Sequence, residues 1–261
     1  AMKIISKLPY IYDEPFADIS QIPTILITEM ASKEVKVCLT GDGGDEIFAG
    51  YNRYIFGANV WRIIKLFPLN FRILISKIIM NISLEKIKKF LVLPSLISPN
   101  IFRLNLIDQK IFKFANLIKA ESSFEIYDKI FCQDDIFKEI VLGISKDQNQ
   151  FKLNFGVSSK LDTVHKMILE DMHYYLPDDI LVKNDRASMY SSLETRLPML
   201  DHRLIDYVAK IPTQKKIRFF KGKWILRKLL NKYLPKKLYE RPKTGFSVPM
   251  SEWLRGPLKK W

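Results

Sequence analysis

The sequence predicts a mainly α-helical fold with a small β part, and three observations support this. Apolar residues recur at helical spacing through most of the chain, one short segment has a convincing strand pattern, and a glycine-rich turn follows it at once. The length of 261 residues allows one large domain or two smaller ones. Hydrophobic residues make up 48% and charged residues 27%, which is ordinary for a globular protein and argues against disorder.

Apolar stripes at helical spacing predict the helices. They cover, in chain order, residues 23–32, 58–92, 160–175 and 200–211. Pro68 is expected to divide the second stretch into two helices, and Asp201 is expected to be the N-cap of the last. Two prolines punctuate a loop over residues 12–24, and the polar residues 143–159 are the best candidate linker.

The strand is predicted at Val35–Leu39, where valines alternate with Lys36 and Cys38. Three glycines and three carboxylates follow within the six residues Gly41–Glu46. Glu46 stands where the dinucleotide-binding fingerprint has its third glycine, and no Gly-Lys-Ser/Thr follows for a phosphate-binding P-loop. The glycines instead allow a ligand to approach the backbone at the carboxyl end of a strand.

The carboxylates of this turn predict a cation site. Asp42, Asp45 and Glu46 are spaced to share one face of a helix that begins there. Clustered carboxylates suit Mg²⁺, which commonly bridges such groups to nucleotide phosphates. The alternative is helix capping, with Thr40 or Asp42 as the N-cap. Capping accounts for one carboxylate but leaves the glycines unexplained, so we favour a ligand site.

Two further stretches combine charged residues with apolar residues or with prolines and glycine. Residues 182–212 place Asp185, Arg186, Glu194 and Arg196 among apolar side chains, where Arg–carboxylate pairs are usually structural. In residues 239–257, two prolines and a glycine stiffen a loop that carries two basic residues, Arg241 and Lys243.

The net charge of +14 is concentrated at one end of the sequence. Residues 212–261 hold 15 Lys or Arg against Glu240 and Glu252, a net +13. Such a segment is either a solvated basic face or a surface for a polyanion or an anionic membrane. We favour the solvated face on charge alone.

Composition also limits the compartment and the metal chemistry. Cys38 and Cys132 lie far apart, and there are only three histidines, so neither a disulfide framework nor a zinc centre is expected. The longest uncharged run, residues 90–102, is too short to span a bilayer, and no signal peptide opens the sequence. A cytoplasmic location is therefore expected.

Four stretches together resemble a known family. They are DEPFADISQIPT, LTGDGGDEIFAGYNRY, DRASMYSSLETRLPMLD and RPKTGFSVPMSEWLRGP. In this order, from Asp13 to Pro257, they are similar to the synthetase domain of glutamine-hydrolysing asparagine synthetases. The resemblance implies an ATP-dependent ligase of the adenine nucleotide α-hydrolase (PP-loop ATPase) group. In that family ATP adenylates the β-carboxylate of aspartate with release of pyrophosphate, and ammonia then displaces AMP to give asparagine.

The resemblance also implies roles for single residues. Thr40 and Gly41, with Gly43, match the turn that contacts ATP, and Asp45 matches the ligand of the Mg²⁺–pyrophosphate group. Asp42 matches an acidic position tied to forming and consuming the acyl-adenylate. Lys243 matches a lysine that reaches the phosphates and the charge that develops during acyl transfer. Asp185, Glu194 and Arg196 also match family positions, and we assign them to the structural wall of the site.

The family's pyrophosphate loop and the nucleophilic cysteine of its glutaminase domain are both missing from the sequence. The expected fold is therefore the C-terminal part of the family's α/β domain, with only a small remnant of its parallel sheet. We expect residues 1–56 to form the residual nucleotide-binding part, residues 57–150 a helical insertion, and residues 151–261 the helical part that completes the site. The isolated chain is expected to be inactive.

The partners implied are aspartate or a related carboxylate, and ammonia from a glutaminase domain outside this chain. Neither a membrane nor a nucleic acid is expected, and a homodimer is open. Two alternatives stay open at this point: amidation of a sugar acid or another carboxylate for surface polysaccharide synthesis, or a non-catalytic basic binding module that uses residues 212–261.

Overall fold

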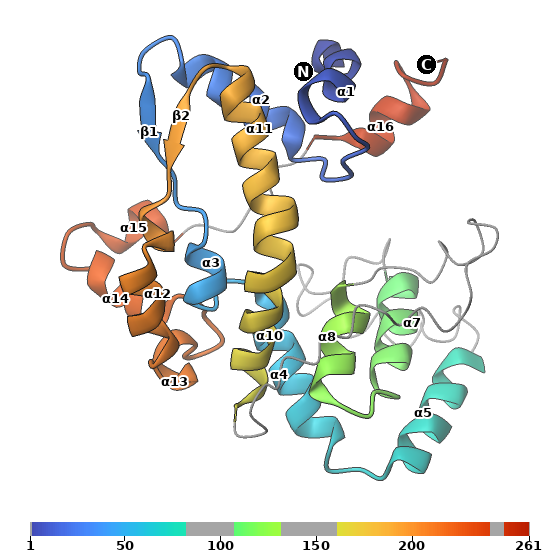
Figure 1. The fold of residues 1–261 in the computed structure, drawn as a ribbon. Coiled ribbons are helices and arrows are strands. Elements are labelled where there is room, and N and C mark those ends of the chain that lie inside the picture. Colours follow the sequence, from blue (N-terminus) through green and yellow to red (C-terminus); the bar gives the residue numbers. More distant parts are fainter. Residues whose placement is uncertain (1, 82–106, 132–160, 241–247, 261) are drawn as a thin grey trace. The chain divides into compact units, whose positions relative to one another are not determined.

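The structure, a computed structural model, describes residues 2–81, 107–131, 161–240 and 248–260 (Figure 1). These residues are mainly helical with one small parallel sheet, as the sequence predicts. The chain divides into two compact units. The first comprises Ala1–Tyr51 and Ile168–Trp261, and the second comprises Asn52–Met167. No helix in the described ranges is both long and apolar enough to cross a membrane.

The first unit contains the sheet and the glycine-rich turn. Its strands are β1 (Val37–Leu39) and β2 (Glu194–Arg196). Its first helices are η1 (Met2–Lys7), α1 (Leu8–Tyr12), α2 (Gln21–Ala31) and α3 (Gly44–Ile47), with the π-helix η3 (Asp171–Leu181) and α11 (Val182–Tyr190) after them. The remaining helices are η4 (Pro198–Leu200), α12 (His202–Ala209), α13 (Thr213–Lys216), α14 (Trp224–Leu230), α15 (Lys236–Tyr239) and α16 (Met250–Arg255).

The two strands pair in parallel, with Val37 opposite Glu194 and Leu39 opposite Arg196 (Figure 1). The expected strand is thus confirmed, although it is shorter than predicted. Its partner lies in a stretch that the sequence marked only by its charges. Because the strands are parallel, both carboxyl ends lie at one edge of the sheet, where β1 enters the glycine-rich turn.

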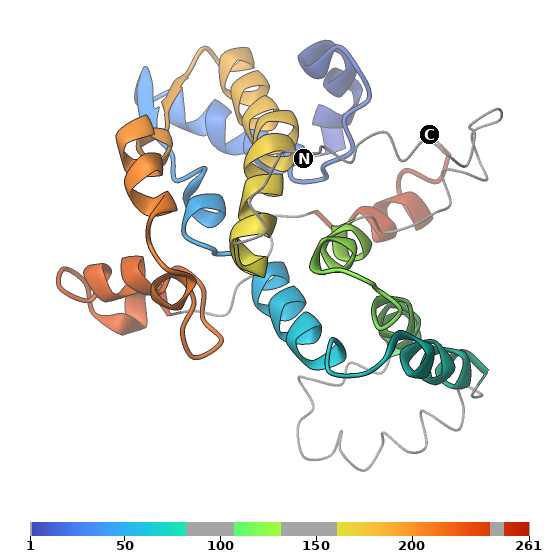
Figure 2. The same ribbon diagram turned by 60° about the horizontal axis from the view of Figure 1, so that its bottom comes forward.

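Helix α2 packs along α11, and both views of the ribbon show them side by side (Figures 1 and 2). The buried face of α2 includes Ile22, Ile25 and Thr28, and the Thr28 hydroxyl donates to the carbonyl of Ala187 at 3.0 Å. The expected helix is confirmed, with its start two residues earlier than predicted. Ile27 is 53% exposed, so it lies outside the buried stripe.

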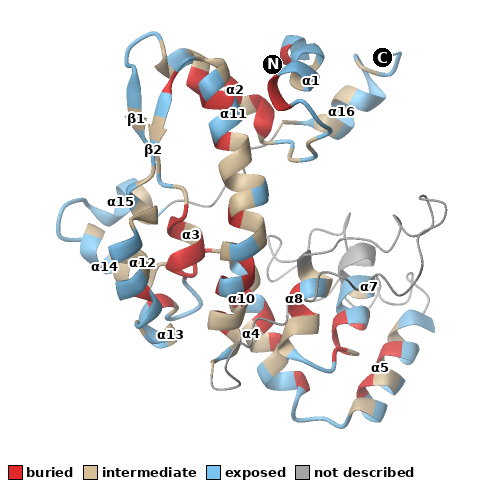
Figure 3. Cartoon of the chain, in the orientation of Figure 1, coloured by how far each residue is buried: buried red, intermediate tan, exposed pale blue. Residues whose placement is uncertain are grey.

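Helix α3 is almost wholly buried (Figure 3). Ile47 and Phe48, at its end, form a core cluster with Val208 of α12. Asp201 caps α12, because its carboxylate accepts a hydrogen bond from the backbone amide of Arg203 at 2.9 Å. The predicted N-cap is therefore confirmed, and it places α12 against the turn that follows β1.

The predicted helix over residues 160–175 is helical in the structure, but its second part belongs to a π-helix. Helix α10 (Thr163–Glu170) carries the chain from the second unit into the first, and η3 follows it directly in sequence. Pro177 lies inside η3 and has no amide hydrogen to donate, which favours a departure from regular α-helix there. The periodicity of the apolar residues gave no sign of this wide helix.

The second unit contains α4 (Asn52–Ile64), α5 (Leu69–Asn81), α7 (Ile107–Leu117) and α8 (Ser123–Phe131). Pro68 separates α4 from α5, as predicted. The core residues that are buried here are Val60, Ile64, Leu117, Ile118, Ala120 and Ile126. The candidate linker, residues 143–159, lies outside the described residues, and the three-part division of the chain stays a prediction.

A buried arginine joins α5 to the segment after α7. The guanidinium of Arg72 donates to the carbonyl of Phe67 at 3.1 Å, to that of Ile118 at 3.2 Å, and to that of Ala120. Ser76, one turn later on α5, donates to the carbonyl of Ala115 at 2.7 Å. Both side chains therefore satisfy carbonyl groups near the end of α7 that have no helical partner.

Replacing Arg72 with alanine is expected to destabilise the second unit by about 3 kcal/mol, because buried carbonyl groups lose charged donors. Urea unfolding of the wild type and of Arg72→Ala measures the difference. Lys77→Ala, on the exposed side of the same helix, is the matched control and is expected to stay within about 0.5 kcal/mol of the wild type. A loss below about 1 kcal/mol for Arg72→Ala would show that these hydrogen bonds contribute little.

Candidate functional site

The glycine-rich turn begins at the carboxyl edge of the sheet. The amide of Thr40 donates to the carbonyl of Arg196 at 2.9 Å, which continues the strand pairing by one residue. Gly41 comes next and is exposed, and no atom of the described structure lies within 4 Å of the position that a Cβ would take there. The backbone is thus open to a ligand at this residue.

Gly43 has a different reason to be glycine. Its φ of 83° is left-handed, and a Cβ would lie 2.1 Å from Cδ2 of Leu200. Gly43 is also the N-cap of α3, and no side chain caps this helix. The capping alternative is therefore wrong for both Thr40 and Asp42. A contact between Gly43 and ATP stays a prediction, since backbone conformation and the packing of Leu200 already account for the residue.

Asp42 is held by two donors that bind the same oxygen. Its Oδ2 accepts from the Thr40 hydroxyl at 2.9 Å and from Nδ2 of Asn184 at 2.8 Å. Asn184 is buried near the start of α11, so its position is fixed by that helix. Among the described residues, none is recorded in hydrogen-bonding contact with Oδ1 of Asp42. The half-buried carboxylate is fixed at one oxygen and presents the other.

Asp45 carries a cationic partner. Its Oδ1 lies 3.0 Å from Nζ of Lys223, and the two side chains are 31% and 29% exposed. Lys223 comes from the residue directly before α14, far along the sequence. This carboxylate already binds a positive charge in the folded chain and remains within reach of solvent.

Glu46 is buried, with 1% of its surface exposed. The hydroxyl of Tyr51 donates to its Oε1 at 2.5 Å. Burial raises the pKa of Glu46 above its usual value, and the neighbouring Asp45 and Asp171 add to the rise against the opposing hydrogen bond from Tyr51. Burial and the adjacent Glu46 likewise raise the pKa of Tyr51, whose ring meets that of Tyr175 edge to face at 5.8 Å.

The expectation that the three carboxylates share one face is wrong. Asp42 precedes α3 and is bound toward α11, Asp45 is paired with Lys223, and Glu46 is buried inside. The i, i+3, i+4 rule needs all three residues on one helix, and the left-handed Gly43 separates Asp42 from it. The turn therefore gives each carboxylate its own environment.

A second group of ion pairs fixes the loop before α2 on α11. Lys183 binds Asp18 and lies 3.8 Å from Asp179, and Arg186 binds Asp13 at 2.9 Å. Burial alone would raise the pKa of Asp18, but its hydrogen bonds with Lys183 and with Ser20 outweigh this and hold the pKa below its usual range.

The assignment of Asp185, Glu194 and Arg196 to the structural wall of the site stays a prediction, and all three residues are exposed. Glu194 and Arg196 bind each other at 2.7 Å on β2, with more than half of each side chain exposed. Asp185 is exposed as well. Lys243 lies outside the described residues, so its predicted approach to the turn stays a prediction.

Sequence reasoning missed Asn184, Lys223 and Tyr51. Asn184 directly precedes the DRAS stretch, but an amide carries no charge to attract attention. Lys223 is one of 15 basic residues in its segment, and only the neighbouring Gly222 distinguished it. Tyr51 follows Glu46 by five residues, a spacing that regular helical periodicity does not pair.

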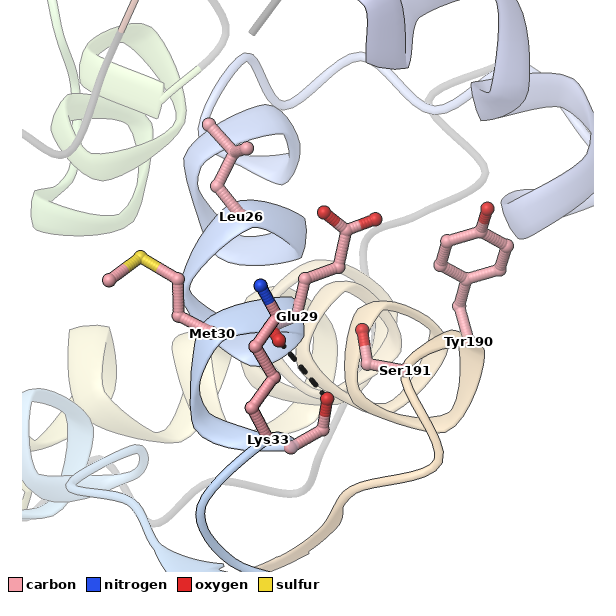
Figure 4. Close-up of a pocket in the computed structure, with 7 residues that line it drawn as sticks. Leu26, Glu29, Met30, Lys33, Tyr190 and Ser191 are labelled. Carbon is pink, nitrogen blue, oxygen red and sulfur yellow. Dashed lines mark hydrogen bonds between the residues drawn. The ribbon is translucent and has the colours of Figure 1, made fainter.

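A pocket of about 610 Å³ lies elsewhere in the first unit, at the C-terminal ends of α2 and α11 (Figure 4). It is lined by Leu26, Glu29, Met30, Ser32, Lys33, Tyr190 and Ser191. None of these is a predicted site residue. The candidate site is therefore the exposed turn at the sheet edge and not this pocket.

The turn suits a cation that is coordinated partly by the protein and partly by a bound substrate. Within the described residues, no group of three or more His, Cys, Asp or Glu side chains is arranged to hold a metal ion alone. Mg²⁺ usually binds one or two carboxylates and takes its other ligands from water and substrate phosphates. Asp45, four residues after the open backbone at Gly41 and partly exposed, suits that arrangement.

The family model for asparagine synthase matches residues 1–261. The chain belongs to the asparagine synthase family. An asparagine synthetase (glutamine-hydrolysing) of Bacillus subtilis is 28% identical over 268 aligned positions, which cover 100% of this chain and 38% of that protein. A putative asparagine synthetase of Mycobacterium bovis is 30% identical with the same coverage. One of Methanocaldococcus jannaschii is 36% identical over 187 positions, 72% of this chain and 32% of the relative.

The chain thus spans 38% of the length of the first asparagine synthetases that it matches. No solved structure matches it. The family membership predicted from the four stretches is confirmed, whereas the roles of single residues stay predictions.

The buried Glu46 predicts a pH-dependent difference in stability. Folding raises the pKa of Glu46 above the value of about 4.3 that a glutamate has in an unfolded chain. The stability that this residue contributes is therefore fully present below a pH of about 4.3, and it is lost as the pH rises through the higher pKa of the folded protein. Glu46→Gln keeps an acceptor for Tyr51 and removes the titration. The free energy of unfolding of the variant, relative to the wild type, is therefore expected to increase as pH rises above about 4.3.

Urea unfolding of both proteins at a series of pH values, without divalent cations, measures this difference. Glu252→Gln, a change at an exposed carboxylate outside the candidate site, is the control and is expected to stay within about 0.5 kcal/mol of the wild type at each pH. If the difference in free energy of unfolding between Glu46→Gln and the wild type did not vary with pH, Glu46 would ionise in the folded protein with no loss of stability.

Proposed function

We propose that this chain supplies the acyl-transfer part of an ATP-dependent amide-forming ligase. In the proposed reaction, the β-carboxylate of aspartate attacks the α-phosphorus of ATP and pyrophosphate leaves. Ammonia then attacks the acyl-adenylate carbon, and AMP leaves as asparagine forms. The observation that carries the proposal is the open turn at the sheet edge, with one carboxylate held ready and a second already paired with a cation.

The turn suits a nucleotide. The open backbone at Gly41 leaves space for a ligand, and ligands of open α/β sheets bind at the carboxyl ends of strands. Thr40 is anchored to β2 by its amide and to Asp42 by its hydroxyl, so the backbone that meets the ligand is rigid. Thr40, Gly41 and Gly43 are the proposed contacts to ATP.

Asp42 is the proposed catalytic carboxylate. Its Oδ2 is held by Thr40 and Asn184, which leaves Oδ1 to interact with the substrate. A carboxylate held in this way can bind a protonated nucleophile and accept a proton from ammonia as the amide forms.

Asp45 is the proposed Mg²⁺ ligand, and the ion would screen the charge of the phosphates and stabilise the pyrophosphate that leaves. Lys243 is the proposed source of a further positive charge at the phosphates, in a loop stiffened by Pro242 and Pro249. Both roles depend on the family resemblance as well as on the turn.

The partners proposed are aspartate and ammonia, with glutamine as the source of ammonia in the whole protein. Since the chain spans 38% of its first relatives, this activity is proposed for the protein that contains the chain. A cytoplasmic location and a homodimer stay predictions.

The test is an assay of the protein as its gene encodes it, with any sequence that adjoins residues 1–261 included. Purified protein is incubated with ATP, Mg²⁺, ammonium and aspartate, and pyrophosphate, AMP and asparagine are measured. We expect all three products in equal amounts, each dependent on aspartate. Products that form equally well with a sugar acid in place of aspartate, or ADP in place of AMP, would contradict the proposal.

Asp42→Asn in the same protein is expected to lower turnover about 100-fold or more, because a neutral amide cannot accept the proton. Asn184→Ala is expected to have a smaller effect, since it removes one of two donors to the carboxylate. Asp206→Asn, an exposed change on α12, is the control. Turnover of Asp42→Asn within about threefold of the wild type would exclude Asp42 as the base.

A further inference from the structure

The pair formed by Lys223 and Asp45 is positioned by unusually close backbone contacts. A Cβ on Gly50 would lie 1.8 Å from Oδ1 of Asp45 and 2.4 Å from Cε of Lys223. A Cβ on Gly222 would lie 2.2 Å from the carbonyl oxygen of Ala49. Two glycines, distant in sequence, thus allow the segment before α14 to press against the turn after α3.

The backbone of Lys223 is itself constrained. Its amide donates to the carbonyl of Phe48 at 3.1 Å, and its φ of 53° lies in the left-handed region, which costs free energy for a residue with a side chain. Arg227, one turn later on α14, donates through Nε to the carbonyl of Gly222 at 3.0 Å. The place of the lysine is therefore set by backbone contacts and is not a chance result of a flexible side chain.

The ammonium group lies at the candidate site. Nζ of Lys223 is 3.0 Å from Oδ1 of Asp45 and 3.7 Å from the position that a Cβ on Gly44 would take. The two side chains are about 30% exposed, but Oδ1 of Asp45 is itself buried, so an ion from solvent reaches this oxygen only when the ammonium group moves. The lysine thus occupies the oxygen of Asp45 with a single positive charge, at the point where the proposed function needs a divalent cation.

We propose that Lys223 is the resident counter-ion of Asp45. It holds the carboxylate in place when no divalent cation is bound, and a divalent cation that binds Asp45 must displace its ammonium group. The inference rests on the proposed function in one respect, the assignment of Asp45 as the cation ligand. It adds a positioning residue, Lys223, that competes with the ion for one oxygen.

Electrostatics gives the direction of the effect. A positive charge a few ångströms from a bound cation repels it, and partial exposure to solvent moderates this repulsion without removing it. Removal of the lysine charge is therefore expected to strengthen cation binding, provided that Gly50 and Gly222 still hold the backbone. A residue with a merely structural role would give the opposite result, because loss of the pair would let Asp45 move away.

The experiment measures Mn²⁺ binding by electron paramagnetic resonance, which counts free Mn²⁺ directly and needs no catalysis. The proteins are the full chain, Lys223→Met, Lys223→Arg and Asp45→Asn. Lys221→Met is the matched control, because Lys221 lies in the same segment and pairs with Glu240 at 3.3 Å, with 56% of its side chain exposed. Circular dichroism confirms that each variant is folded.

Lys223→Met is expected to lower the dissociation constant for Mn²⁺ by about threefold to tenfold. Lys223→Arg and Lys221→Met should match the wild type, and Asp45→Asn should abolish the site. If Lys223→Met binds Mn²⁺ as the wild type does, more weakly or not at all, the inference is wrong. If Asp45→Asn at the same time loses Mn²⁺ binding, the assignment of Asp45 as the cation ligand still holds. If Asp45→Asn binds as the wild type does, the assignment of Asp45 fails, and this inference fails with it.

Discussion

The site depends on the first turn of α11. Three acidic residues from earlier in the chain bind this turn, through Lys183, Asn184 and Arg186. They are, in the same order, Asp18, Asp42 and Asp13. Helix α11 can serve in this way because its next turn is buried against α2, through Ala187 and Ser188. Packing fixes the helix, and the fixed helix places Asp42, the carboxylate for which we propose a catalytic role.

This arrangement also explains why two of the family stretches lie so far apart in sequence. The loop that contains Asp18 and the turn that contains Asp42 are both short. The loop packs Phe16 on the core beside α1, and its acidic residues bind Lys183 and Arg186 of α11. The turn is held on the same helix through Asn184. Truncating Asn184 or Lys183 therefore affects a segment about 140 residues or more away in sequence, as the separations of 142 and 165 residues show.

Backbone conformation then divides the three carboxylates among three tasks. The left-handed Gly43 turns the chain between Asp42 and the helix, so that Asp42 faces α11 and Asp45 faces Lys223. Glu46 is buried behind them with Tyr51. Three groups of the same chemical type thus have three different sets of partners, because the backbone places each in its own environment. The glycines of the stretch are as necessary as the acids.

The sequence predicted those parts of the molecule that local rules determine. Helix α2, strand β1, the break at Pro68 and the cap at Asp201 follow from periodicity, proline chemistry and capping, each of which acts within a few residues. Strand β2 was missed because three residues leave no alternation to recognise. The Asn184 contact was missed because it joins residues 142 apart. The family was recognisable because its four stretches keep their order, but their spatial relation required the fold.

Part of the basic charge near the C-terminus lies at internal positions. Lys216 is buried, with 1% of its surface exposed, and Lys223 is paired with Asp45. Most of the other basic residues that the structure describes in this segment are exposed, which agrees with the solvated basic face that the charge alone favours. Lys223 is thus the residue of this segment that brings a positive charge to the glycine-rich turn, and it does so because the backbone before α14 is held against that turn.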